Sequence, residues 1–358
     1  MRKNIILLSL AIVFSCVAWA QEVFVPASNK NIVYSGRVNH SNPQSPAFVY
    51  PGTSIKANFS GSSIKMKAKP GSGFFMVSID AQEPQKICFT KTDSILTLAQ
   101  GLPNSEHSVD IMLAYEGYEW KPEFRGFYLS EGGKINSLSI LPSRKIEFIG
   151  NSITCGYGSE AANGKIHFTY DTENFYYTYA ANTARELDAQ LMVAARSGIG
   201  AYRNYNGKVD GDENTMPRWY DYTLLYDNSQ KWNFRNFHPN VICVNLGTND
   251  LSTRPYKIDL YKKNYKNFII HLRKLQPQAK IVMITGSMLQ GEPLKDQKQA
   301  LDEIYKELHA SGYKALYRFD FTTQDGTLGY GADYHPSIQQ HRKMANELIP
   351  FIRQITGW

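Results

Sequence analysis

The chain has 358 residues, a net charge of +7 at pH 7, 42% hydrophobic and 20% charged residues. This length suggests two domains, and the lysines and arginines form no dense run, which argues against a nucleic-acid-binding protein. Beyond the first twenty residues, Cys88, Cys155 and Cys243 lie far apart and are odd in number, so they indicate buried thiols rather than a disulfide scaffold or a metal site.

Residues 1–20 have the layout of a secretory signal peptide. Two basic residues precede an apolar run, which ends in the small-residue motif Ala18-Trp19-Ala20. The run is short for a membrane anchor, and the residues before Cys16 suit a lipoprotein signal poorly. We therefore expect cleavage after Ala20, a secreted or periplasmic protein, and no membrane span in the mature chain.

Residues 21–140 are predicted to form an antiparallel β-sandwich. In the segment SIKANFS, Ile55, Ala57 and Phe59 alternate with polar residues, and several similar segments follow. Clusters of turn-forming residues, such as YPGTS and GLPNSE, separate them. This alternation, with regular turn signals, is typical of a sandwich. The pattern reveals neither a nucleophile nor a metal cluster in this half.

Residues 141–358 are predicted to form an α/β domain, because short apolar strands now alternate with amphipathic helices. A parallel sheet covered by helices on both faces fits this order. The expected strands are 145–150, 190–195, 240–247, 280–286 and 314–321. The expected helices are 173–189, 261–276, 294–312 and a last one that begins near Pro336.

Four loops should meet at one edge of this sheet, because ligands of such folds lie beyond the carboxyl ends of the strands. Ser152 follows the first strand, and the segment SGIG, residues 197–200, follows the second. GTND, residues 247–250, follows the third, and DYHPS, residues 333–337, precedes the last helix.

Ser152 is the candidate nucleophile, and it needs a base within hydrogen-bonding distance. Of the eight histidines, only His335 lies in a loop at the expected edge. Asp333, two residues earlier, is the candidate for orienting the imidazole as the third member of a triad, with a turn or helix-capping role as the alternative.

An ester carbonyl under attack develops an oxyanion, which preorganised N–H donors stabilise. The candidates are the Ser152 amide, the Gly200 amide, preferred to that of Gly198, and the Asn249 side chain. Asn249 could instead serve only as a turn former.

These motifs resemble the SGNH (GDSL-like) hydrolases, whose marker serine, glycine, asparagine and histidine fall on Ser152, Gly200, Asn249 and His335. The longer GNSITCGYG, after a β-sandwich, resembles carbohydrate esterase family 2 more narrowly. This resemblance implies a jelly-roll domain before a three-layer α/β/α catalytic domain. The chain departs from the usual pattern at Ala332, where many such enzymes carry the acid, so a Ser–His dyad supported by a backbone carbonyl stays open as the alternative to a triad.

The resemblance implies a secreted serine esterase that removes acetyl groups from polysaccharide, such as acetylated xylan or glucomannan, with no metal or cofactor. Tyr202, Tyr205 and Trp219 are candidate sugar-stacking residues, with core packing as the alternative. The rival functions are an esterase or lipase for small or lipid acyl esters, and a carbohydrate-binding protein with an inactive hydrolase domain. The pattern does not define the oligomeric state.

Overall fold

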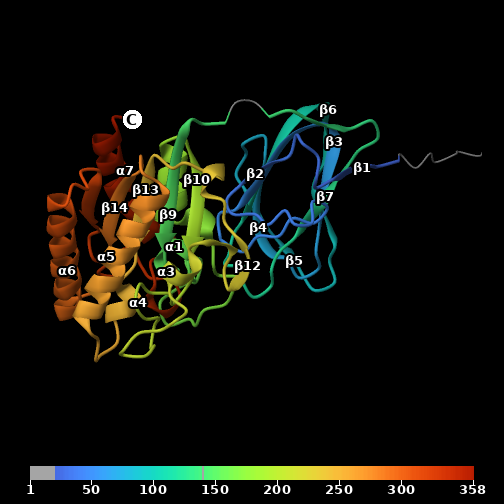
Figure 1. Cartoon of the computed structure of the whole chain (residues 1–358). Helices are drawn as coiled ribbons and strands as arrows, with labels where there is room; N and C mark the ends of the chain where they lie inside the picture. The colour runs from blue at the N-terminus through green and yellow to red at the C-terminus, as the bar shows by residue number, and fades with distance from the viewer. Residues whose placement is uncertain (1–20, 139–140) are drawn as a thin grey trace, which may run out of the picture.

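The computed structural model describes residues 21–138 and 141–358, so the predicted signal peptide lies outside the described residues. An antiparallel sheet is built from the N-terminal part of the chain, and a parallel sheet with its helices from the rest (Figure 1). A search of the described helices for one long and apolar enough to cross a membrane finds none.

The antiparallel sheet has eight strands, in the order β1-β7-β3-β6-β4-β5, with β2 and β8 also paired to β3. The alternation predicted in β3 is confirmed, because Ile55, Ala57 and Phe59 are at most 1% exposed and point into the core of this domain. Register shifts near Gly61 and Ile64 let the long strands β3 and β6 bend around that core. The strands are β1 (Val23–Pro26), β2 (Val33–Ser35), β3 (Ser54–Ala68), β4 (Gly73–Ile79), β5 (Gln85–Phe89), β6 (Ile95–Leu113), β7 (Phe124–Leu129) and β8 (Lys134–Asn136).

The second sheet has five parallel strands, in the order β10-β9-β13-β14-β15, as the alternating pattern predicted. Its side chains form one core with α5 and α6 and another with α2 and α7, so helices cover both faces. The strands are β9 (Arg144–Gly150), β10 (Ala189–Ala195), β13 (Val241–Asn245), β14 (Lys280–Thr285) and β15 (Leu316–Asp320). The helices are α2 (Tyr179–Glu186), α5 (Ile258–Leu275), α6 (Gly291–Ala310) and α7 (Ile338–Thr356).

Two local expectations need correction. The helix expected over 173–189 is divided, because Thr178 has an extended backbone and its hydroxyl caps α2 by accepting the Ala181 amide at 3.2 Å. The segment GTND is not only a loop, since its last three residues begin α4. The last helix begins at Ile338, close to the expected Pro336, and Ser337 caps it.

The remaining short elements are α1 (Ser152–Cys155), η1 (Phe175–Tyr177), α3 (Met216–Trp219), β11 (Tyr222–Leu224), β12 (Asp227–Lys231), η2 (Phe234–Asn236), α4 (Thr248–Leu251) and η3 (Ala332–Tyr334).

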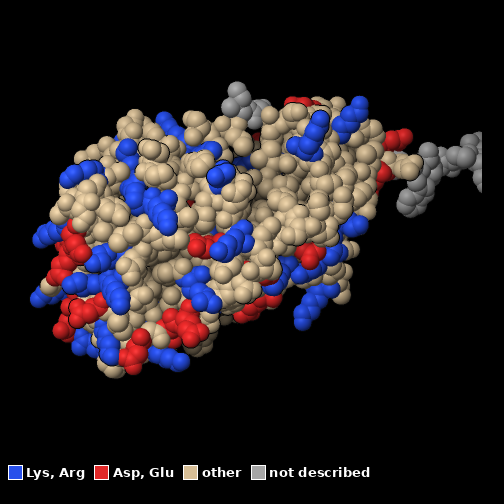
Figure 2. Space-filling view, viewed as in Figure 1, with Lys and Arg blue, Asp and Glu red and all other residues tan. Residues whose placement is uncertain are grey.

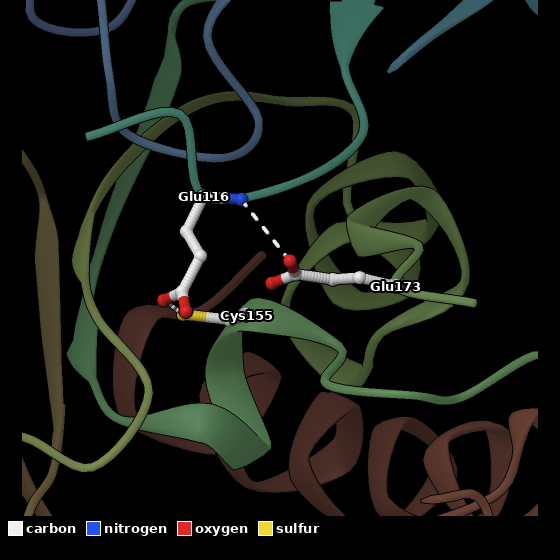
Figure 3. Close-up of side chains that lie close together, drawn as sticks. All are labelled: Glu116, Cys155 and Glu173. Carbon is white, nitrogen blue, oxygen red and sulfur yellow. Dashed lines mark hydrogen bonds between the residues drawn. The ribbon is translucent and has the colours of Figure 1, made fainter. Parts of the chain in front are cut away.

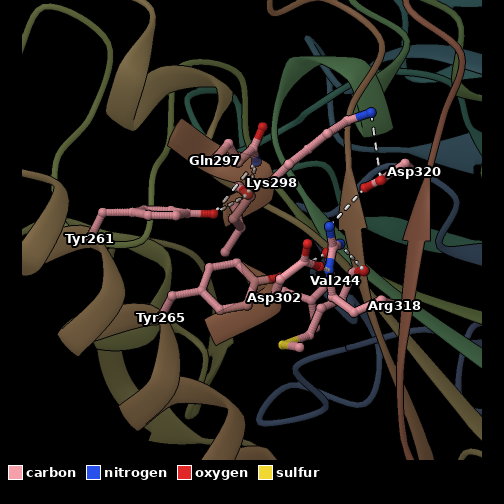
Figure 4. A network of polar contacts seen from close by, with 10 residues as sticks. Val244, Tyr261, Tyr265, Gln297, Lys298, Asp302, Arg318 and Asp320 are labelled. Carbon is pink, nitrogen blue, oxygen red and sulfur yellow. Dashed lines mark hydrogen bonds and ion pairs between the residues drawn. The ribbon is translucent and has the colours of Figure 1, made fainter. Parts of the chain in front are cut away.

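Polar contacts fix the helices to the end of β13, the strand that leads to Asn249. Tyr261 and Tyr265 of α5 donate hydrogen bonds to the carbonyl oxygens of Leu246 and Val244, at 3.3 and 3.0 Å (Figure 4). A second set, also in Figure 4, joins α6 to β15, where Arg318 contacts Asp302 at 2.9 Å. These bonds give a fixed position to the chain that follows β13.

The two sheets are joined by a buried ion pair. Arg37, from the segment after β2, lies 3.1 Å from Glu147 of β9, and neither side chain is more than 2% exposed. The Glu147 carboxylate also accepts the hydroxyl of Tyr220 at 2.9 Å. Separating such partners would leave a charge buried without compensation, which costs about 3–5 kcal/mol.

On the surface, by contrast, basic and acidic side chains are interspersed over the helical part of the face shown in Figure 2.

Candidate active site

Ser152 begins α1 just after β9, in a turn that requires glycine at position 150. A Cβ atom at Gly150 would lie 2.0 Å from the Thr154 hydroxyl, so the strand can approach α1 this closely only with glycine. Gly156 ends the helix with φ at 86°. The side chain of Asn151 caps the helix by accepting the Ile153 amide at 3.1 Å. The turn therefore presents the Ser152 side chain at the carboxyl edge of the sheet.

His335 faces Ser152, although 183 residues separate them in the chain. The distance from Nε2 to the Ser152 hydroxyl oxygen is 2.9 Å, and that from Nδ1 to the carbonyl oxygen of Ala332 is 3.2 Å. The ring of Tyr157 packs on the imidazole with 4.1 Å between centroids. Burial lowers the pKa of His335 to about 4, so at neutral pH the ring is uncharged. With its proton on Nδ1, Nε2 can accept the proton of the serine.

The Asp333 carboxylate makes no hydrogen bond to the imidazole, unlike in the expected triad. Its backbone lies in the left-handed region, with φ at 48°, and this turns the side chain towards the segment after α1. Its carboxylate accepts hydrogen bonds from Tyr157 and His167, both at 2.9 Å, and from the Phe168 amide at 3.0 Å. These bonds outweigh the effect of burial and hold the pKa of Asp333 below its usual value. Asp333 thus fixes the tyrosine that packs on His335.

The predicted oxyanion donors come from three elements. Within the described chain, the amides of the three residues after Ser152 all bond back to Asn151, whereas that of Ser152 has no partner. The Gly200 amide has a long bond of 3.2 Å to the Asn204 side chain. Asn249 is 6% exposed, and its amide group donates to the carbonyl of Ile199 at 2.8 Å. Asn249 is therefore tied to the loop that carries Gly200.

Asp250 is a buried acid that our reading of the sequence missed. Its carboxylate accepts the amides of Ala201 at 2.9 Å, Tyr202 at 2.7 Å and Arg203 at 3.2 Å. Burial raises the pKa of Asp250 to about 6, although these bonds oppose the shift. The side chain thereby holds the backbone next to Gly200. The available signal was the acid of GTND, which directly follows the candidate oxyanion donor Asn249 after an apolar strand.

The three candidate stacking residues differ in exposure. Tyr202 is only 2% exposed and packs in the core, where its hydroxyl accepts the Lys257 amide at 3.1 Å, so it cannot stack on a sugar and that expectation is wrong. Trp219 is half-buried against Tyr226, with 5.3 Å between ring centroids. Tyr205 is 56% exposed, and its amide bonds the carbonyl of Gly198 at 2.8 Å.

Tyr334 is a further exposed aromatic residue that the sequence reading did not select. It is 53% exposed and directly precedes His335. Its ring packs against Tyr330 with 5.5 Å between centroids, which holds it beside the site. The signal available was its position in DYHPS, next to the candidate base.

Parallel strands covered by helices, with a serine and a neutral histidine in contact at their carboxyl edge, define the class of GDSL-like hydrolases. Residues 148–343 match the model of the GDSL-like Lipase/Acylhydrolase family, and residues 34–138 match that of the Carbohydrate esterase 2 N-terminal domain. The chain belongs to carbohydrate esterase family 2, and is a carboxylic ester hydrolase by its domain.

Similar proteins carry names of the same kind. The Cellulase/esterase CelE of Acetivibrio thermocellus is 36% identical over 92% of this chain, which spans only 40% of the length of that relative. An Acetylxylan esterase / glucomannan deacetylase of Cellvibrio japonicus is 31% identical over 93% of this chain and 91% of its own. The structure of a family two carbohydrate esterase from Clostridium thermocellum in complex with cellohexaose has a TM-score of 0.86 and 35% identity, and covers 91% of this chain and 99% of that one.

Proposed function

We propose that this protein is a serine esterase that removes acetyl groups from polysaccharide through an acyl-enzyme. The observation that carries the proposal is the 2.9 Å contact between Ser152 and a neutral His335 at the carboxyl edge of the sheet. The Ser152 oxygen attacks the acetyl carbonyl while Nε2 of His335 takes its proton. The same nitrogen then protonates the sugar oxygen as it departs, and later activates the water that releases acetate.

The imidazole in this mechanism is supported by a backbone carbonyl rather than by an acid. Its Nδ1–H donates to Ala332, which fixes the tautomer and lowers the energy of the imidazolium as it forms. The pair is thus a dyad, in which the Asp333 carboxylate holds Tyr157 against the ring and favours the imidazolium only through its charge. The negative charge that develops on the carbonyl oxygen is stabilised by hydrogen bonds from the amides of Ser152 and Gly200 and from the Asn249 side chain.

The proposed substrate is an acetylated polysaccharide with a β-linked backbone, because the relatives are named for xylan and glucomannan and one neighbouring structure holds cellohexaose. Tyr205 and Tyr334 would supply the stacking surfaces, since both rings are more than half exposed and adjoin the loops of the site. In this proposal residues 1–20 direct secretion, residues 21–140 form the β domain and residues 141–358 the catalytic domain.

The test is acetate release from acetylated xylan and acetylated glucomannan by the wild type and by Ser152→Ala. We expect the variant to lose at least a thousandfold in rate, with an unchanged melting temperature. Ser159→Ala is the matched control, because Ser159 is a buried serine whose hydroxyl bonds the Asn174 carbonyl instead of a histidine. Equal activity of wild type and Ser152→Ala would overturn the mechanism. Faster hydrolysis of long-chain esters than of acetylated polysaccharide would favour a lipase, and no esterase activity at all would favour a binding protein.

A further inference from the structure

One carboxylate of the β domain joins the two segments that carry the nucleophile and the Gly200 loop. Glu116 lies in the segment after β6 and is 4% exposed. Its Oε2 accepts the amide of Ser197 at 2.6 Å and the thiol of Cys155 at 3.3 Å. Cys155 ends the helix that Ser152 begins, and Ser197 lies three residues before Gly200. A side chain from another domain therefore contacts both.

Glu116 has the neighbours of a charged acceptor. Burial raises the pKa of Glu116, and the short bond from Ser197 and the guanidinium of Arg196 limit this rise by favouring the carboxylate. Arg196 in turn lies over the ring of Tyr118, 5.3 Å from its centroid, and donates to its hydroxyl at 3.4 Å. Because Tyr118 belongs to the same segment as Glu116, this segment fixes two consecutive residues of the loop.

Glu173 is the second carboxyl group of the cluster (Figure 3). Its Oε2 accepts the Glu116 amide at 3.3 Å, while its Oε1 is buried without a partner among the described residues. Two carboxylates this close inside a protein do not both stay ionised. Burial and the nearby Glu116 raise the pKa of Glu173 well above its usual value, so this is the group that stays protonated.

Glu116, Cys155 and Glu173 also form the one group of three buried metal-binding side chains in the part of the chain that the structure describes. Two features argue against a cation there. The Oε2 of Glu116 is already bonded to the Ser197 amide, and Arg196 places a positive charge beside it. The thiol of Cys155 has its pKa raised well above the usual value by burial, so it is a donor rather than a thiolate ligand.

We propose that Glu116 is a positioning residue, which holds the loop 196–200 at the distance from Ser152 that oxyanion binding requires. This inference rests on the proposed esterase function. It gives the β domain a part in the active site, because the bond to Ser197 sets the position of the Gly200 amide relative to α1. Oxyanion donors act only when preorganised, and a displacement of about 1 Å can cost about a hundredfold in rate.

The test compares three variants on 4-nitrophenyl acetate. In Glu116→Ala the loop loses its acceptor, and we expect kcat to fall about a hundredfold with KM within about twofold of wild type. Glu116→Gln keeps an oxygen for the Ser197 amide but not the charge, so we expect a fall of about tenfold. Glu173→Gln is the matched control, equally buried in the same cluster but without a bond to the loop, and its kcat should stay within about twofold.

A second readout separates positioning from a merely structural role. An alkylboronic acid forms a tetrahedral adduct on Ser152 that places an oxygen among the oxyanion donors, so its affinity should fall in each Glu116 variant by the same factor as kcat. A lower melting temperature with unchanged kcat and boronate affinity would overturn the proposal. If Glu116→Ala does not fold, Glu116→Gln decides by the same criteria.

The failure of this inference differs from the failure of the proposed function. A wild type with no Ser152-dependent esterase activity would remove both. Wild-type activity that depends on Ser152, together with normal kcat and boronate binding in both Glu116→Ala and Glu116→Gln, would remove only the positioning role. Loss of wild-type activity in EDTA that zinc restores would show that the cluster is a metal site, which would also overturn it.

Discussion

The choice between a dyad and a triad can be tested by Asp333→Asn. Asparagine tolerates the left-handed backbone of this position at least as well as aspartate, so the turn should survive. In a triad, the same change costs about 10⁴-fold in kcat, which corresponds to about 5.5 kcal/mol of transition-state stabilisation. Here the carboxylate is bonded to Tyr157, His167 and the Phe168 amide, and Nδ1 of His335 is bonded to Ala332. We therefore expect kcat to fall by no more than about fivefold.

The expected effect of Asp333→Asn on stability is also small. The Asp333 side chain is 34% exposed and its partner His167 is 93% exposed, so water screens their contact. The asparagine oxygen can still accept one bond, which limits the loss to about 1 kcal/mol. The assay is kcat on an aryl acetate, beside thermal unfolding and beside His335→Ala, which should be inactive. A hundredfold fall in kcat at an unchanged melting temperature would refute the dyad and restore Asp333 as the orienting acid.

Three further outcomes follow from the site and its surroundings. The kcat/KM profile should lose activity only as pH falls through about 4, because His335 must be neutral to act as base; an acid limb near pH 6.5 would contradict this. His341 is buried with its pKa lowered to about 3, so it adds stability that is complete above about pH 6.5 and is lost towards pH 3. In denaturant titrations, the free energy of unfolding of the wild type should fall between pH 7 and pH 5 by about 2 kcal/mol more than that of His341→Gln. Gly200→Ala should lower kcat at least a hundredfold, since its Cβ would lie 1.8 Å from the Arg203 carbonyl oxygen; near-normal kinetics would show that the loop is not rigid.

The sequence was sufficient to place Ser152 and His335 at one edge of the sheet. Parallel strands all end at the same edge, so the position of each loop in the alternating pattern implies its position in space. The same rule brought the Gly200 and Asn249 segments together, and the structure links them by a 2.8 Å bond. The rule predicts which segments lie close together, but it does not predict the direction in which a side chain of such a segment points.

Asp333 illustrates what the rule leaves out. Its two-residue distance from His335 made it the natural orienting acid, but the direction of its side chain depends on one backbone angle, φ at 48°. Tyr202 illustrates the same limit for burial. It lies in an irregular, aromatic and polar stretch with no periodicity, so nothing in the pattern could tell that Asp250 and Lys257 would enclose it.

The role of Glu116 could not be predicted from the sequence for a different reason, because its partners belong to another domain. An acid in a turn between strands usually faces water, and the segment AYEGYEWK around Glu116 gives no sign of burial. The bond to Ser197 exists only because the β domain packs on the edge where the nucleophile helix and the Gly200 loop meet. A β domain whose only task was to bind glycan would not need a carboxyl group enclosed at that junction, since burying such a polar group is costly unless its bonds serve the fold or the site. The Glu116 variants therefore also decide whether the two domains form one catalytic unit or two units that act independently.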